Sequence, residues 1–228
     1  SPEEKQLYLA NLAQVNEQLQ QQLELEQVDS ILIIAMMTRL RQICCEPRML
    51  YENYKGESTK FTMCLELIET LKENGKKVLL FSSFTSIFDS FIEEFKQRGI
   101  KYHMITGAVD KKKRKEEVDA FQSDDSDVFL ISLKAGGTGL NLTKAQAVIH
   151  YDPWWNVSAQ NQATDRAYRI GQTKNVLVYQ LLMKNTIEAK IYEMQKRKKE
   201  MSDIFVENSN GGISTLSKEE LRDLFSME

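Results

Sequence analysis

Residues 127–139 read D-V-F-L-I-S-L-K-A-G-G-T-G, an apolar run followed at once by a glycine-rich loop. The run from Asp127 to Ser132 is short and almost wholly apolar, which is typical of a strand buried in a parallel sheet. In sheets of that kind, functional loops gather at the carboxyl ends of the strands. The stretch therefore predicts a core strand with a candidate site directly after it.

Similar short apolar runs recur on both sides of this strand, and helical patterns separate them. The predicted strands are 78–82, 101–105, 127–132, 147–151 and 176–182. Predicted helices start near Thr59, contain Phe88 to Phe95, and cover 110–121, 158–168 and 186–201. Strands that alternate with helices predict a parallel sheet covered on both faces. The expected fold class is α/β, with one doubly wound domain over residues 58–185.

Helical segments flank this predicted domain. Apolar residues at spacings of three and four predict helices over 3–27 and 31–44, the second of which ends before Pro47. Residues 1–57 are therefore expected to form a helical protrusion with a linker. Residues 186–228 are expected to form a long charged helix, a flexible joint and a short capped helix.

Composition excludes several classes of protein. The chain has 228 residues, of which 42% are hydrophobic and 28% are charged, so it has the material for a real core. No apolar run approaches the roughly 18–20 residues of a membrane-spanning helix, and we expect no membrane partner. Three cysteines, two of them adjacent, fit buried thiols in a reducing compartment. A net charge of −3 argues against coating nucleic acid by bulk charge, but it permits a local basic groove.

The glycine-rich loop has the features of a phosphate-binding loop. Three glycines within 136–139 let the backbone approach a ligand closely and leave amides free to face an anion. Ser132, Lys134 and Thr138 add donors that suit phosphate. The alternative is a tight turn that needs only positive φ angles, and we favour the binding loop because one glycine would satisfy such a turn.

A second candidate is residues 160–172, which read Q-N-Q-A-T-D-R-A-Y-R-I-G-Q. Arg166 and Arg169 stand three apart and therefore share one face of the predicted helix. Two guanidinium groups on one face suit a multiply charged anion. The alternative is a solvated face with a local pair between Asp165 and an arginine. The string G-x-x-x-x-G-K-[ST] is absent, so this sequence holds no triphosphate cradle to match the arginines.

Three further features have two readings each. Trp154 and Trp155 in Y-D-P-W-W-N either belong to the core or stack on a base. The run K-K-K-R-K over 111–115 either contacts a phosphate backbone or is a solvated helix face. His103 and His150 show no metal-ligand or catalytic spacing, and we assign both to ordinary structure.

Five segments in a fixed order carry a resemblance. They are L-R-Q-I-C-C-E-P (40–47), V-L-L-F-S-S-F-T (78–85), S-L-K-A-G-G-T-G-L-N-L (132–142), V-I-H-Y-D-P-W-W-N (148–156) and Q-x-x-D-R-A-x-R-I-G-Q (162–172). The second, third and fifth resemble motifs four, five and six of the Swi/Snf-type DNA-dependent ATPases of helicase superfamily two. The first and fourth resemble the entry to that family's second lobe and the link between motifs five and six.

The resemblance implies a RecA-like second lobe, which binds ATP and Mg²⁺ together with a first lobe that holds most of their contacts. Arg166 and Arg169 would then be arginine fingers, and Gln162 and Asp165 would orient their helix. Gly139 and Asn141 would lie at the nucleotide edge.

The same resemblance implies contacts with double-stranded DNA. The residues that match DNA-contacting positions are Ser82, Ser83, Thr106, Gly107, Lys134, Thr138, Trp154 and Trp155. The N-terminal helices would form part of the lobe-two protrusion, and the C-terminal helices would form a brace.

The expected function is that of a second motor lobe of a DNA translocase that remodels protein–DNA complexes. The expected partners are double-stranded DNA, the first RecA-like lobe and DNA-bound proteins. The chain alone is expected to hydrolyse no ATP, because the phosphate cradle is missing. The expected location is the bacterial cytoplasm or nucleoid, or the nucleus in a eukaryote. The alternative function is a non-catalytic RecA-like scaffold that recruits partners.

Overall fold

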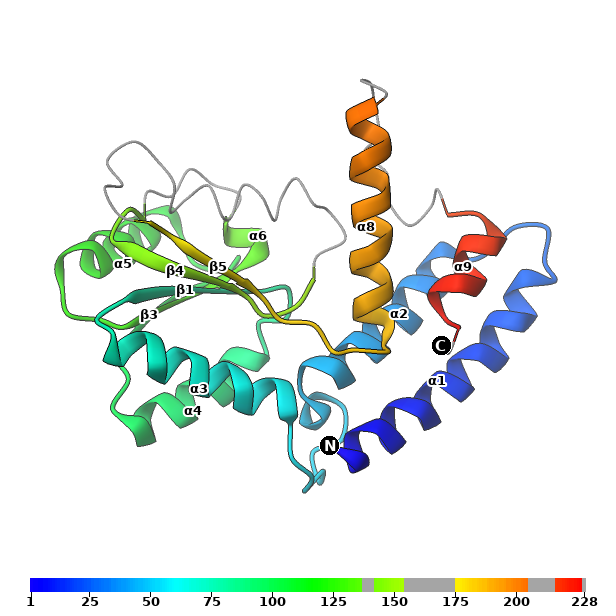
Figure 1. Cartoon of the computed structure of the whole chain (residues 1–228), viewed down its shortest axis with the longest axis horizontal. Coiled ribbons are helices and arrows are strands. Elements are labelled where there is room, and N and C mark those ends of the chain that lie inside the picture. Colours follow the sequence, from blue (N-terminus) through cyan, green and yellow to red (C-terminus); the bar gives the residue numbers. More distant parts are fainter. Residues whose placement is uncertain (137–141, 154–174, 205–215, 227–228) are drawn as a thin grey trace. The chain divides into compact units, whose positions relative to one another are not determined.

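The computed structural model describes residues 1–136, 142–153, 175–204 and 216–226 (Figure 1). The chain divides into two compact units. Phe61–Leu181 form one unit, called here the sheet unit, while Ser1–Lys60 and Leu182–Glu228 together form the helical unit. The sheet unit is thus one continuous segment of the chain, and the helical unit consists of the segments before and after it.

Five parallel strands form the sheet. They are β1 (Lys77–Ser82), β2 (Tyr102–Ile105), β3 (Val128–Ser132), β4 (Ala145–His150) and β5 (Leu177–Gln180), in the spatial order β2-β3-β1-β4-β5. The predicted α/β class with a parallel sheet is confirmed. The last strand is shorter than the predicted 176–182, because β5 pairs only with residues 147–150 of β4.

Helices cover both faces of this sheet. On one face lie α3 (Thr59–Glu73) and α4 (Ile87–Arg98), side by side in Figure 1. There the ring of Phe91 packs on Phe61 and, edge-on, on Tyr151, with centroids 4.7 and 5.3 Å away. On the other face, α5 (Lys111–Ser123) packs Phe121 against Phe129, with centroids 5.0 Å apart. Aromatic packing on both faces therefore fixes these helices to the sheet.

Glycine ends two of these helices, as their sequence predicts. Gly75 follows α3 with a φ of 64°, and Gly99 caps α4 with a φ of 61°. This left-handed backbone costs glycine little and other residues more. Each helix therefore stops in time for the chain to turn into the next strand.

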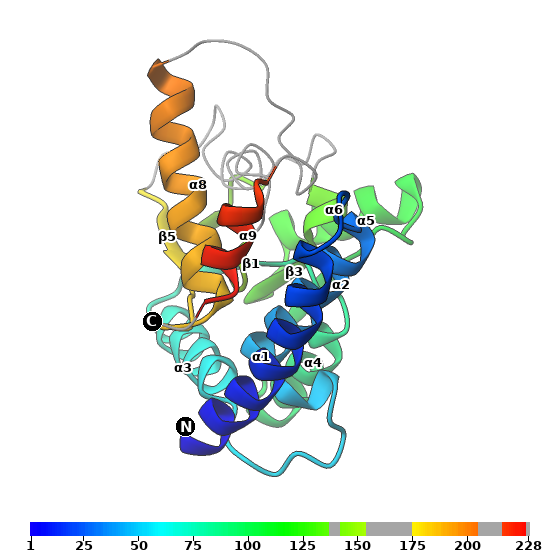
Figure 2. The ribbon, with the colours of Figure 1, turned by 90° about the vertical axis from the view of Figure 1, so that its right-hand side faces the viewer.

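The helical unit contains α1 (Pro2–Leu23), α2 (Ser30–Cys45), a 3₁₀ turn η1 (Pro47–Met49), α8 (Ile187–Ile204) and α9 (Lys218–Leu224). The predicted apolar face of α1 is confirmed, since all of its members are buried: Tyr8, Leu12, Val15, Leu19 and Leu23. Figures 1 and 2 show α9 beside α8.

The first helix ends at Leu23, four residues before the predicted end at Gln27. The side chain of Asp29 accepts hydrogen bonds from the amides of Ile31 and Leu32, at 2.9 and 3.3 Å, and so starts α2. A helix start at that place requires a turn before it.

A distant carboxylate, rather than a neighbouring hydroxyl, caps the start of α3. Ser58 or Thr59 is the cap that the sequence predicts. In the structure the Thr59 amide donates instead to Glu4 Oε1, at 3.0 Å. Glu4 lies on α1, so this bond ties two helices as well as capping one.

A buried ion pair joins the two chain segments of the helical unit. Lys60 Nζ lies 2.6 and 2.5 Å from the two carboxylate oxygens of Glu188, and the side chains are only 3% and 0% exposed. Burial alone would lower the pKa of Lys60, but the Glu188 carboxylate raises it above its usual value. Glu188 Oε2 also accepts the Met183 amide at 3.0 Å, so the loop before α8 is held as well.

Cys44, Cys45 and Cys64 are buried and form no disulfide, as the sequence predicts. Among the described residues, no helix has both the length and the apolar character needed to cross a membrane.

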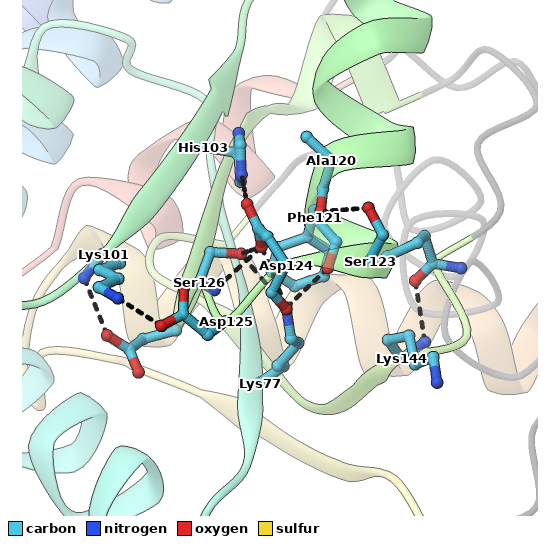
Figure 3. Close-up of polar contacts among 12 residues, drawn as sticks. Lys77, Lys101, His103, Ala120, Phe121, Ser123, Asp124, Asp125, Ser126 and Lys144 are labelled. Carbon is cyan, nitrogen blue, oxygen red and sulfur yellow. Dashed lines mark hydrogen bonds and ion pairs between the residues drawn. The ribbon is translucent and has the colours of Figure 1, made fainter.

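A charged cluster holds together the end of the sheet at which the strands begin (Figure 3). His103 of β2 contacts Glu117 through Nδ1 and Asp124 through Nε2, both at 2.7 Å. Lys77 at the start of β1 donates to the Phe121 and Asp124 carbonyls, at 2.7 and 2.9 Å. These contacts tie α5 and the following loop to two strands.

We expect Glu188→Ala to lower the free energy of unfolding by about 3–5 kcal/mol, because it leaves the Lys60 ammonium buried without its partner. The double variant Lys60→Met with Glu188→Leu should recover much of this loss. Urea denaturation measures both values. A loss below about 1 kcal/mol in the single variant would contradict the inferred role of the pair.

We expect the stabilising effect of His103 to depend on pH. Burial lowers the pKa of His103, but Asp124 and Glu117 outweigh it and the net shift is upward. The stabilisation is therefore full below the unfolded pKa of about 6.5 and disappears as the pH rises through the folded pKa. The stability gap between wild type and His103→Gln should be larger at low than at high pH in urea titrations. A constant gap would contradict the assignment.

Candidate functional site

The carboxyl ends of the strands bring together the loops that the sequence singles out. β1 ends at Ser82, β2 at Ile105, β3 at Ser132 and β4 at His150. Ser82 and Ser132 are register partners on the adjacent strands β1 and β3. Because neighbouring strands lie about 4.8 Å apart, the loops after these strands start in one row along the edge of the sheet.

Asp152 forms the centre of this edge. Its Oδ1 accepts the hydroxyl of Ser82 at 2.6 Å and the amide of Ser83 at 3.0 Å. Its Oδ2 accepts the hydroxyl of Ser83. Asp152 is 1% exposed, and a buried carboxylate needs such donors to offset its lost hydration. The loop after β1 is therefore fixed to the segment after β4.

The two predicted serines differ in what they offer a ligand. Ser82 has no exposed surface, and its Oγ accepts the Phe84 amide at 3.1 Å in addition to donating to Asp152. Ser83 is half-buried. In this conformation Ser83 has surface available to a ligand, while Ser82 holds the shape of the loop. A DNA contact of either serine stays a prediction.

The end of β4 is apolar apart from one neutral imidazole. His150 stacks on Phe81 of β1, with ring centroids 5.6 Å apart and planes inclined by 22°. Burial lowers the pKa of His150 to about 4, despite the opposing charge of Asp152. The Tyr151 amide then donates to the Phe81 carbonyl at 2.9 Å, which carries the chain on to Asp152.

The loop after β2 is short and open. The Val109 amide donates to the Thr106 carbonyl at 3.2 Å, which closes a turn around the exposed Gly107. Thr106 is half-buried. Both predicted residues therefore lie at the carboxyl edge with surface available to a ligand.

The loop after β3 begins with a short helical turn, α6 (Leu133–Gly136), where the sequence predicts the start of a glycine-rich loop. The Ala135 amide donates to Ser132 Oγ at 3.3 Å, so the last residue of the strand caps the turn. Lys134 lies on this turn. Ser132 and the backbone of Lys134 thus lie at the end of β3.

Several predicted site residues lie outside the described part of the chain. They are Thr138, Gly139, Asn141, Trp154, Trp155, Gln162, Asp165, Arg166 and Arg169. Within the described ranges, no group of three or more His, Cys, Asp or Glu side chains is arranged to hold a metal ion.

Asp152 is the residue at this edge that the sequence patterns did not single out. The pattern Y-D-P-W-W-N drew attention to the tryptophans, although an acid directly after a core strand was itself a signal. Parallel strands end at one edge of the sheet. An acid that follows β4 must therefore lie near the polar residues that end β1. Its partners are 69 and 70 residues away in the chain, which is why no local pattern revealed them.

Comparison with known proteins supports the fold described above. The helicase conserved C-terminal domain family matches residues 59–171. The Sulfolobus solfataricus SWI2/SNF2 ATPase C-terminal domain superposes on the whole chain with a TM-score of 0.79, over 95% of its own length and with 25% sequence identity. The ATPase core of the same organism, in complex with dsDNA, aligns with the whole chain at a TM-score of 0.82 and 31% identity, over 48% of its length.

The chain belongs to the Swi/Snf-type family. It corresponds to the C-terminal RecA-like lobe of that family. A putative ATP-dependent helicase/translocase of Bacillus subtilis is 37% identical over 202 residues, which are 86% of this chain and 22% of that protein. The Swi/Snf-type lobe thus spans about a fifth of the length of the curated relatives it matches.

In the Swi/Snf-type lobe we expect Asp152→Asn to lower the free energy of unfolding by about 1–3 kcal/mol, because an amide cannot accept from all three donors. Urea denaturation measures this loss. The matched control Asp119→Asn changes an exposed residue of α5 and should stay within about 0.5 kcal/mol of wild type. Equal stability of the two variants would contradict the role given to Asp152.

Proposed function

We propose that this chain is the second motor lobe of a DNA-dependent ATPase that moves along double-stranded DNA and remodels protein–DNA complexes. Membership of the Swi/Snf-type family supports this proposal. The similar Sulfolobus ATPase core, which was solved in complex with dsDNA, supports the choice of duplex as the track.

The observation that carries the proposal is the set of hydrogen bonds around Asp152. On one side, Asp152 holds the loop after β1, which offers Ser83 at the edge of the sheet. On the other side, residues 154–172 follow Pro153 directly and carry Arg166 and Arg169. A shift of the β1 loop on a DNA backbone would therefore act on the start of the arginine segment. A motor that moves on DNA needs such a link to couple its DNA contacts to its ATP site.

The ATP site, in this proposal, is completed between two lobes. Arg166 and Arg169 reach the phosphates, Gln162 and Asp165 orient them, and a first lobe supplies the phosphate cradle with Mg²⁺. The absence of G-x-x-x-x-G-K-[ST] from the printed sequence supports this division of labour. Gly139 and Asn141 would line the nucleotide side of the β3 loop.

The DNA track, in turn, runs along the carboxyl edge. Ser83, Thr106 and Gly107 all have surface available there. Backbone amides and hydroxyls at such an edge suit phosphate oxygens, which position a duplex without reading its sequence. Lys134, Thr138, Trp154 and Trp155 would add contacts from the β3 and β4 loops.

In the whole protein we expect Arg169→Ala to lower DNA-stimulated ATP hydrolysis by about 10³-fold or more, because an arginine finger stabilises the charge of the transition state. ATP binding should persist, since the first lobe holds the nucleotide. A phosphate-release assay measures turnover, and equilibrium dialysis measures binding.

Two controls sharpen the result. Arg169→Lys keeps the charge but loses the planar donor fork, so it should restore little activity. The chain by itself should show no turnover. Near-normal hydrolysis by Arg169→Ala, or turnover by the chain alone, would refute the two-lobe assignment.

A further inference from the structure

Four lysines at the start of α5 form an exposed cationic surface. Lys111, Lys112, Lys113 and Lys115 lie within the first five residues of the helix, and all four are exposed. They are called here the α5 lysine group. Arg114 is not part of it, because it is half-buried and donates to the Val109 carbonyl at 3.5 Å.

Two acids close to this group have other partners. None of the four lysine side chains forms an ion pair or hydrogen bond with another described residue. Asp110, just before the helix, uses Oδ1 to accept the Lys113 amide at 2.9 Å and so serves as the helix cap. Glu117, one turn after Lys113, contacts His103 instead.

The position of the group opposes the stability of α5. The amino end of a helix carries partial positive charge, which favours acids and disfavours cations. The first turn of α5 contains no acid, only lysines and an arginine. The cations also repel one another. The electrostatic free energy of the group therefore becomes favourable only when an anion with several charges lies across it.

The topology places the group beside the candidate DNA track. α5 follows the Thr106–Gly107 turn, and that turn follows β2, the outermost strand on its side of the sheet. From β4 to β2 the carboxyl ends span three strand spacings, or about 15 Å. The α5 lysine group lies at the start of the helix that follows β2. It therefore continues this row of loops beyond its outermost strand.

The opposite edge of the sheet shows the contrast. There, the cations Lys77 and Lys101 are paired with Asp124 and Asp125, and Figure 3 shows those contacts. These two cations are therefore neutralised at the edge where strands begin. The α5 lysine group, at the edge where the track is proposed, has no ion-pair partner among the described residues.

We propose that the α5 lysine group binds the phosphate backbone of a DNA duplex, beyond the phosphates that Thr106 and Gly107 reach. This inference rests on the proposed function and adds to it a sequence-independent anchor on α5. Lysine suits the task, because a point charge on a flexible stem follows phosphates without fixed geometry. The sole aromatic residue of α5, Phe121, is fully buried, so α5 offers no platform for stacked single-stranded bases.

The test compares two triple variants of this chain. The first is Lys112→Gln, Lys113→Gln and Lys115→Gln, since glutamine keeps the helix propensity of lysine. The matched control is Lys76→Gln, Lys96→Gln and Lys144→Gln, which removes the same charge from the sheet unit at residues outside the proposed track. Fluorescence anisotropy gives the dissociation constant for two short duplexes of unrelated sequence over a series of salt concentrations.

We expect the α5 variant to lose affinity equally for both duplexes. Its plot of log affinity against log salt should be shallower by about 0.9 for each lysine that contacts a phosphate, or by about 2–3 overall. The control variant has the same net charge as the α5 variant, but the lysines it loses lie outside the proposed track. It should therefore keep the wild-type slope. The thermal midpoint of the α5 variant should equal or exceed that of wild type, because like charges at a helix start are removed.

Each contrary result has a distinct meaning. Wild-type chain that binds neither duplex counts against the proposed function itself. Wild-type binding with an unchanged slope in the α5 variant overturns only the lysine anchor. The anchor is likewise overturned if both triple variants lose the same slope, or if the α5 variant loses only binding to vesicles of anionic lipid.

Discussion

All five strands run parallel, and this one constraint puts every loop that follows a strand at the same edge of the sheet. A parallel pair needs a long crossover, so residues far apart in the chain arrive there as neighbours. Asp152 reaches Ser82 and Ser83 in this way, across about seventy residues. The pairing of the backbone, not any local motif, therefore assembles the candidate site.

Charge is divided along the strands in the same manner. Where strands begin, His103, Lys77 and Lys101 each meet a carboxylate, and the charges offset one another. Where strands end, the α5 lysine group faces solvent. Paired surface charges add a little to the stability of the fold. Unpaired charges create an electrostatic potential that can attract an oppositely charged partner. The two ends of one sheet thus differ in that the charges named where strands begin are paired, whereas the lysines at the start of α5 are not.

The sequence predicts what depends on short range. Periodicity predicted the buried face of α1 and all five strands, and Gly75 and Gly99 stand just after α3 and α4, where helices favour glycine. Long-range partners were missed, because no residue type reveals them. Glu4, rather than a neighbouring hydroxyl, accepts the amide at the start of α3. Lys60 contacts Glu188, which is 128 residues away in the chain. Asp152 had a signal, since its place after a strand follows from topology alone.

The buried contact of Lys60 with Glu188 also sets an order of events during synthesis. Lys60 emerges from the ribosome before most of the sheet unit, but its ionic partner Glu188 follows only after the whole sheet unit has been made. Until then, the Lys60 ammonium must stay in water, and the surface that later encloses it stays open. Domains generally fold as units while the chain emerges. The sheet unit can therefore fold before the helical unit, because the helical unit needs the segments on both sides of the sheet unit.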